Sequence, residues 1–208
     1  MNTAIQLLDE NKDNHLPNIA ASKGLDVYRS FTSFEPLPAS LKDQASTTTV
    51  FLKTLLEKRH YLDALQFIAH GLTKHEAIAW AHHSLHSLNE TDNQDTNTSL
   101  TLHEVEVWLA DPTPEKCLPF GDHADTFDDP LTWLRLAIFW NGPNISAHQE
   151  VSVQPSPQLT GHGVSTALIL GAVGNKYKSI AECHTLFLDL GIKRALGLLP
   201  RVDVKENY

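Results

Sequence analysis

The sequence predicts an all-α fold, and three observations support that prediction. First, the helix-start pattern Ser/Thr-x-x-Glu begins at Thr73, Thr101 and Ser179. In this capping box the hydroxyl accepts a hydrogen bond from an early backbone N–H, and the glutamate accepts one from the capping residue. Second, Thr113-Pro114 and Asp129-Pro130 place proline at a first helical position, where its missing N–H costs nothing. Third, apolar residues between these starts recur every three or four positions.

Residues 1–45 are expected to form an irregular N-terminal arm, because prolines interrupt them and Asp, Asn and Ser are frequent. The arm is nevertheless too apolar for a purely solvated tail. We expect it to lie across the helical body. The alternative is a docking segment that becomes ordered on a partner, with Tyr28, Phe31 and Phe34 as its candidate partner-binding residues.

An all-helical domain is expected over residues 46–200, with about seven or eight helices at the apolar spacing of 3.6 residues. Four helices are predicted in its first half, over residues 47–57, 61–70, 73–88 and about 102–110. Gly71 ends the second of them as a C-terminal cap. The polar run 89–99 is expected to be a loop.

The second half of the domain begins with a short helix at Thr113. The next helix, over about residues 130–140, has one charge, and a helix that is apolar all round is buried. It is predicted to be the central element of a single compact domain. A long loop over 141–158 leads to two further helices, over about 160–173 and 179–198. Residues 201–208 are expected to be a polar tail.

Composition restricts the class of protein. A chain of 208 residues can bury one solid core, and its formal net charge is −9. That charge argues against nucleic acid and against docking on anionic membranes. The longest apolar run, residues 164–173, is half of the roughly 20 residues that a bilayer requires. No signal peptide is recognised, and two cysteines are typical of a reducing compartment, so a cytoplasmic location is expected.

Histidine is abundant among the candidate metal ligands, with 12 copies. His75, His82 and His86 fall on one helical face, and the last two stand at i and i+4, as paired zinc ligands do. The pattern is not His-Glu-x-x-His, however. The three residues also flank the apolar stripe, which favours a half-exposed polar face over a metal site.

Two other groups of candidate residues are also explained more simply by structural roles. The carboxylate-rich turn Asp122–Asp129 could hold a hard cation, but its spacing is not that of an EF-hand, and turn formation explains part of it. Cys117 and Cys183 are more simply small core residues than a nucleophile or ligand set. No cofactor is therefore expected.

Arg135 is the single charge of the apolar helix, so it must be paired if it is buried. We expect an internal Asp or Glu as its partner. The alternative is that Arg135 binds a carboxylate of a protein partner. The tryptophans would be interaction hot spots on a surface, but helical spacing favours the core.

Four segments resemble the uncharacterised bacterial family DUF6931. They are Tyr61–Trp80, Val107–Glu115, Asp129–Gly142 and Leu159-Thr160. The patterns Trp-x-x-Asp-Pro-Thr and Trp-x₆-Trp-x-Gly occur in them in a fixed order. The resemblance covers about residues 60–200 and leaves the N-terminal 45 residues outside.

This resemblance implies a helical, cytoplasmic protein without an assigned activity. The family's genes lie near type VI secretion clusters, which implies an accessory, adaptor or chaperone role by association. His82 and His83 stand where the family has small or apolar residues. A metal site shared across the family is therefore disfavoured.

The sequence contains no phosphate loop, serine elbow or pair of catalytic carboxylates, and no catalytic or cofactor-binding residue is predicted. We expect a non-enzymatic protein-binding module of the bacterial cytoplasm, serving a type VI secretion component or effector. One rival is a metal-dependent hydrolase that uses His75, His82, His86 and the 122–129 turn. Another is a toxin or immunity partner.

Overall fold

The computed structural model describes residues 2–11, 14–37, 39–41, 46–89, 96–122, 127–146 and 152–200. Within these ranges the chain forms helices and irregular segments, which confirms the all-α prediction. The predicted tail 201–208 lies outside the described residues, as do 90–95 of the polar loop and 123–126 of the acidic turn. Across the described helices, none is long and apolar enough to cross a lipid bilayer.

The described residues form nine α-helices and two 3₁₀ helices. They are α1 (Asn2–Glu10), α2 (Gly24–Tyr28), η1 (Ala39–Leu41), α3 (Thr48–Glu57), α4 (Tyr61–Gly71), α5 (Lys74–Asn89), α6 (Thr96–Ala110), η2 (Glu115–Gly121), α7 (Pro130–Phe139), α8 (Leu159–Gly174) and α9 (Ile180–Ala195). Elements α3 to α9, together with η2, occupy the positions of the predicted helices.

Two predicted helix starts need correction. The start predicted at Thr101 is wrong, because α6 already begins at Thr96 and Thr101 is buried inside it. The start at Thr113 leads to the 3₁₀ helix η2 and not to an α-helix. Pro119 lies inside η2 and has no N–H for a regular α-helical ladder.

The irregular structure expected over residues 1–45 is wrong for α1 and α2. Pro17 falls between these two helices and Pro36 follows α2, so neither proline interrupts them. As expected from its apolar residues, the segment packs on the helical body. Leu8, Leu16 and Val27 are buried in the same core cluster as the later helices.

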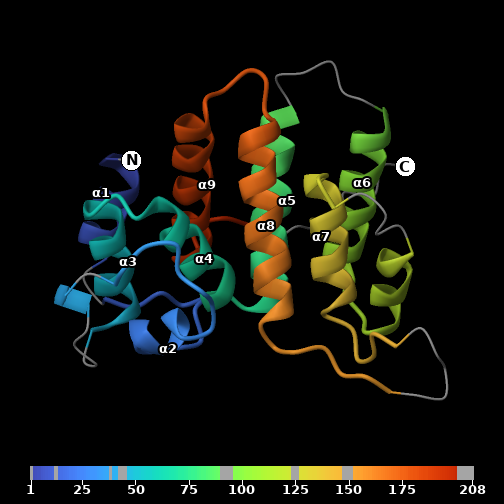
Figure 1. Ribbon diagram of the computed structural model, residues 1–208, viewed down its shortest axis with the longest axis horizontal. Coiled ribbons are helices and arrows are strands. Elements are labelled where there is room, and N and C mark those ends of the chain that lie inside the picture. Colours follow the sequence, from blue (N-terminus) through green and yellow to red (C-terminus); the bar gives the residue numbers. More distant parts are fainter. Residues whose placement is uncertain are drawn as a thin grey trace.

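Helices α5 and α8 lie in the middle of the molecule, as Figure 1 shows. Helices α1 to α4 and α9 lie on one side of this pair, and α6 and α7 lie on the other. Helix α8 contacts α4, α5, α7 and α9, and α5 contacts α6, α7, α8 and α9. The C-terminal ends of α5 and α8 point to the same end of the molecule.

Helix α7 was predicted to be the central element, but it lies to one side of the α5 and α8 pair (Figure 1). It is buried where it meets η2, α5, α6 and above all α8. Gly163 of α8 permits the close approach, because a Cβ at that position would lie 2.9 Å from the Cβ of Ala137. Trp133 and Trp140 are only half-buried along α7, with ring centroids 6.2 Å apart.

The prediction that the tryptophans lie in the core is confirmed for Trp80, which is fully buried between α5 and α9. Its indole N–H donates to the carbonyl of Phe187 over 2.8 Å. Gly191 lies against the indole, and an added Cβ there would be 2.8 Å from the ring. The close approach predicted at Gly171 is also present, since its Cβ would lie 2.6 Å from Leu85.

Candidate functional site

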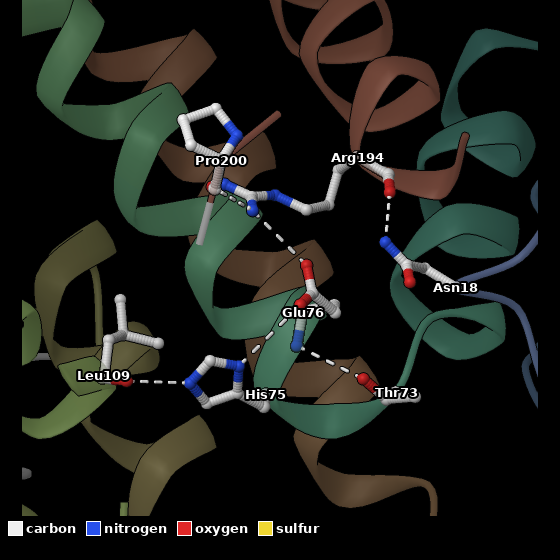
Figure 2. Close-up of polar contacts among 7 residues, drawn as sticks. All are labelled: Asn18, Thr73, His75, Glu76, Leu109, Arg194 and Pro200. Carbon is white, nitrogen blue, oxygen red and sulfur yellow. Dashed lines mark hydrogen bonds and ion pairs between the residues drawn. The ribbon is translucent and has the colours of Figure 1, made fainter. Parts of the chain in front are cut away.

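Side chains that could carry chemistry gather at the two ends of α5. At its N-terminal end lies the α5 polar cluster, which we define as Asn18, Thr73, His75, Glu76 and Arg194 (Figure 2). At its C-terminal end, beside the end of α8, lies a cavity with a mixed apolar and polar lining, the α8 pocket. The two places differ in burial, charge and access.

A buried ion pair lies at the centre of the α5 polar cluster. Arg194 is 3% exposed, and its Nη1 lies 3.3 Å from Oε2 of Glu76, whose side chain is 13% exposed. The same Nη1 donates to the carbonyl of Pro200 over 2.9 Å. Burial lowers the pKa of the Arg194 guanidinium, while the Glu76 carboxylate opposes that shift. The pair therefore joins α9 and the segment after it to the first turn of α5.

Glu76 occupies the capping-box position of α5, yet its carboxylate does not cap the helix. The Thr73 hydroxyl accepts from the Glu76 N–H over 3.4 Å, which is one half of the motif. The carboxylate instead faces Arg194 and lies 3.9 Å from Nδ1 of His75. The predicted helix start is confirmed, and the glutamate has a tertiary role that its motif does not reveal.

Asn18 ties the N-terminal segment to the same place. Its side-chain amide donates to the carbonyl of Arg194 over 2.7 Å, and its backbone N–H donates to the carbonyl of Ala195 over 3.2 Å. Its own carbonyl accepts from the N–H of Thr73 over 3.2 Å. The cluster thus joins three segments that are remote in sequence, and its polar groups point at one another and not into a cavity (Figure 2).

The three candidate metal ligands on α5 are not brought together as a ligand set. Nε2 of His75 lies 2.9 Å from the carbonyl of Leu109, and Nε2 of His82 lies 3.1 Å from that of Leu102. A carbonyl only accepts, so both nitrogens carry protons. These two contacts are seven residues apart on both helices and connect α5 to α6.

The rings of His86 and His82 lie near each other, with centroids 6.0 Å apart. Burial, and then His86, lowers the pKa of His82 to about 4, so its ring is neutral near pH 7. Within the described part of the chain, no group of three or more His, Cys, Asp or Glu residues could hold a metal ion.

A second histidine pair was not predicted from the sequence. His70 of α4 and His162 of α8 are in edge contact, with ring centroids 4.7 Å apart. Burial, and then the charge of His162, lowers the pKa of His70 to about 4. The pair depends on the packing of α4 against α8, which no local sequence pattern predicts.

The candidate partner-binding residues of the N-terminal segment do not share one exposed face. Phe31 is buried, with its ring 5.3 Å from Tyr28 and 5.4 Å from His70. Tyr28 is half-buried, and Phe34 is 58% exposed. Phe34 is fixed by its backbone N–H, which donates to Oδ1 of Asp63 over 2.7 Å. Phe34 alone of the three offers a largely exposed side chain.

Arg135 pairs with a carboxylate of the same chain, as predicted, but that carboxylate belongs to the exposed Glu104 and does not lie inside the fold. Its Nη1 lies 2.5 Å from Oε2 of Glu104, and its guanidinium lies 5.4 Å from the centre of the Phe120 ring. Glu104 is the glutamate of the capping pattern that begins at Thr101. Like Glu76, it forms a tertiary ion pair and does not cap a helix.

The remaining candidates have structural roles. Asp129 caps α7, because Oδ1 accepts from the N–H of Leu131 and Oδ2 from that of Thr132. Cys117 and Cys183 are buried free thiols, and burial raises the pKa of both.

The α8 pocket is a cavity of about 200 Å³ where the ends of α5 and α8 meet the starts of α6 and α7. Its lining residues are Leu85, Leu88, Thr98, Asp129, Pro130, Leu131, Leu170, Gly171, Gly174, Asn175, Lys176 and Tyr177. Val173 and Tyr177, beside or on its rim, are 62% and 59% exposed. The sequence analysis missed this pocket and predicted a buried helix for the run that ends at Val173.

The fold and these two places define a compact helical protein whose polar residues hold helices together and whose pocket opens at one end. The chain belongs to the family of unknown function DUF6931, whose sequence profile matches residues 51–195. The match begins in α3 and ends at the last residue of α9. No curated protein and no solved structure matches the chain.

Proposed function

We propose that this protein is a non-enzymatic binding module, an adaptor or chaperone-like accessory protein of the bacterial cytoplasm that serves a type VI secretion system. The observation that supports this proposal is that several large apolar side chains are exposed in or close in sequence to the lining of the α8 pocket. Contiguous exposed apolar side chains mark protein interaction sites on soluble domains, and aromatic residues supply much of the binding energy there.

The surface lies on the turn between α8 and α9. Val173, Tyr177 and Ile180 are each about half exposed or more, and all three lie within eight residues of one another. Leaving such side chains in water has a cost of about 25 cal/mol per Å² of apolar area. A partner that covers them would recover that free energy.

The α5 polar cluster supports the same proposal because its polar groups contact one another and do not face solvent as a reactive site would. Its ion pair and its histidine contact are internal, so they stabilise the scaffold that presents the turn. The link to type VI secretion comes from the gene neighbourhood that the family resemblance implies, and it is an association and not a mechanism.

The test is affinity capture of tagged protein from its native host, followed by mass spectrometry. Wild type is compared with Val173→Asp, an exposed position next in sequence to the lining residue Gly174, and with the matched control Val107→Asp, an exposed position on α6. We expect a secretion component or effector with wild type and with the control, and its loss with Val173→Asp. Failure of wild type to retain any partner would refute the binding role, and capture of other proteins only would refute the secretion link.

A further inference from the structure

The net negative charge of the chain is concentrated in one segment. Residues 90–150 contain 12 acidic and two basic side chains, a formal charge of −10, whereas the rest of the chain contains 13 acidic and 14 basic side chains, a formal charge of +1. The helices of this segment are α6, η2 and α7, and Figure 1 places α6 and α7 on one side of the α5 and α8 pair. We call the surface of these three elements the acidic side. Its field attracts cationic groups and repels anionic ones.

The basic side chains of the acidic side are already used within it. Arg135 and Lys116 each form an ion pair with a carboxylate of the same side. Three further carboxylates are exposed and form no ion pair with a described residue, namely those of Glu115, Asp122 and Asp128. A basic partner would therefore meet carboxylates that are available to pair.

Leu118 of η2 gives the acidic side an exposed apolar side chain between two of these carboxylates. Side chains three positions apart lie in line along a 3₁₀ helix. Cys117 and Phe120 form the buried line of η2, and Glu115 and Leu118 lie along an outer one. Leu118 is 48% exposed, and Asp122 follows as the C-cap. The outer face of η2 thus combines an apolar contact with flanking negative charge.

Phe127 is a second exposed apolar side chain of the acidic side, directly before Asp128. It is 60% exposed, and its ring lies in edge contact with that of Trp133, with centroids 6.0 Å apart. The Trp133 indole N–H donates to the carbonyl of Phe127 over 2.8 Å, which fixes this residue against α7. An exposed aromatic ring attracts Lys and Arg side chains to its face. This residue therefore also suits a basic partner.

Two lysines from outside the segment reach the edges of the acidic side. Lys74 donates to the carbonyl of Trp140 over 3.5 Å, and Lys176 lines the α8 pocket together with Asp129. Adding both to the charge of −10 for residues 90–150 still leaves −8. The sign of the field is therefore unchanged, and the partner that it selects is basic.

Other occupants fit this side poorly. A second copy that met this one through the acidic side of both would bring two strongly negative surfaces together, and the rest of the chain, at +1, offers no complementary charge. Nucleic acid and anionic lipid are repelled for the same reason. These considerations leave a basic protein as the occupant with complementary charge.

From these observations we propose that the acidic side binds a basic protein segment, with an apolar residue of the segment against Leu118 and its Lys or Arg side chains beside Glu115, Asp122 and Asp128. This surface goes beyond the proposed function, which concerns the turn between α8 and α9. The apolar contact supplies affinity by burial, and the carboxylates supply selectivity and rapid association.

A matched pair of double variants tests the charge. Glu115→Gln with Asp122→Asn removes two charges from the acidic side. Glu10→Gln with Asp26→Asn removes two charges from α1 and α2, which Figure 1 places on the other side of the α5 and α8 pair. All four residues are exposed, so both variants are expected to fold as wild type does, and both have the same net charge.

A second matched pair tests the apolar contact. Leu118→Ala shortens the exposed side chain of η2. Leu198→Ala makes the same change at a residue that is 58% exposed and follows α9. Because both leucines are about half exposed or more, neither substitution is expected to unfold the protein.

The probe is a library of random linear peptides displayed on phage and selected on the immobilised full-length protein. We expect the selected peptides to be rich in Lys and Arg and to share a large apolar residue. Measured by calorimetry at low salt, their affinity should fall about fivefold with Leu118→Ala and at least several-fold with the acidic-side double variant. Added salt should weaken binding to wild type more than to that variant. Both control variants should bind as wild type does.

Three results would overturn the inference. They are selected peptides without an excess of Lys and Arg, equal affinity for wild type and the acidic-side double variant, and an equal loss in the two double variants, which would mean attraction by net charge alone. The proposed function is judged separately by native-host capture with Val173→Asp. Basic peptides that are lost with Val173→Asp and retained by the acidic-side double variant would refute this inference and leave the proposed function standing.

Discussion

The two ends of α5 differ in which side chains are buried and which are exposed to solvent. At the N-terminal end, Glu76 and Arg194 are charged, buried and paired with each other. At the C-terminal end, leucines line a cavity that opens to solvent, and its lining also includes Asp129 and Lys176. The N-terminal end of α5 thus has a buried ion pair, and its C-terminal end borders a cavity that is open to solvent.

The difference separates scaffold from function. Burying charges is tolerated only when they pair, so the contacts at the N-terminal end fix the relative positions of the helices. Uncovered apolar surface contributes nothing to stability, and its presence at the other end is better explained by a partner. Substitutions at the first end should change unfolding, and substitutions at the second should change binding.

The largest expected effect is on the buried pair. Glu76→Gln leaves Arg194 buried and without a counter-charge, and breaking such a pair costs about 3–5 kcal/mol of unfolding free energy. Urea denaturation measures the loss. The control is Glu182→Gln, the same position of the capping box on α9, where the carboxylate is exposed and glutamine can still complete the box, so the cost should be much smaller.

The double variant Glu76→Leu with Arg194→Met sharpens this test. Replacing both charges by apolar side chains removes the unpaired group, so the double variant should be more stable than Glu76→Gln alone. Equal destabilisation of the double and single variants would show that packing, and not the unpaired charge, sets the cost.

Acidification should destabilise the protein through its buried histidines. Burial lowers the pKa of His70 and of His82 from 6.5 to about 4. Between these pH values the unfolded chain binds more protons than the folded one, so the unfolding free energy falls as the pH falls. Each histidine contributes a slope of at most about 1.4 kcal/mol per pH unit.

Thermal or urea denaturation across this pH range measures the slope. His82→Gln keeps a donor for the carbonyl of Leu102 and cannot titrate, so its slope should be smaller than that of wild type. Above pH 6.5 both histidines are neutral in either state, and the slope from them should vanish. An unchanged slope in the variant would mean that His82 is not the titrating group.

Local chemistry explains which parts of the fold were predictable. The starts of α7 and α9 follow from Asp129-Pro130 and from Ser179 with Glu182, because each cap satisfies backbone N–H groups within four residues. Thr101 shows the limit of the same reasoning. Its motif lies inside α6, where Glu104 pairs with Arg135, so a capping pattern alone does not locate a helix start.

The candidate site depends on contacts that no local pattern contains. Glu76 and Arg194 are 118 residues apart, and the sequence predicts only that such a buried charge requires a partner. The α8 pocket forms where the ends of four helices converge, so its shape follows from tertiary packing. Gly174 and Lys176 are a weak signal in hindsight, because a glycine and a lysine at a helix end are also ordinary capping residues.

A smaller effect is expected from the caps themselves. The Ser179 hydroxyl accepts from the N–H of Glu182 over 3.3 Å, and the Glu182 carboxylate accepts from Ser179, which completes the capping box. Ser179→Ala should cost about 1 kcal/mol. Thr73→Ala removes only half a capping box, with a bond of 3.4 Å, and should cost less. Thermal denaturation of the two variants ranks them, and the reverse order would contradict the comparison.

The smallest expected effect on stability is that of Gly174→Ala at the cavity, where it distinguishes a change in stability from a change in binding. Gly174→Ala adds a methyl group to the last residue of α8, where no atom lies within 4 Å and φ is not in the left-handed region. Less flexibility in the unfolded chain should stabilise the protein by about 0.4–1 kcal/mol. One methyl group occupies little of the cavity, so capture of a partner from the native host should persist in Gly174→Ala and be lost in Gly174→Leu. Loss of binding with both substitutions would mean that backbone flexibility at Gly174, and not the open volume of the pocket, is what the partner requires.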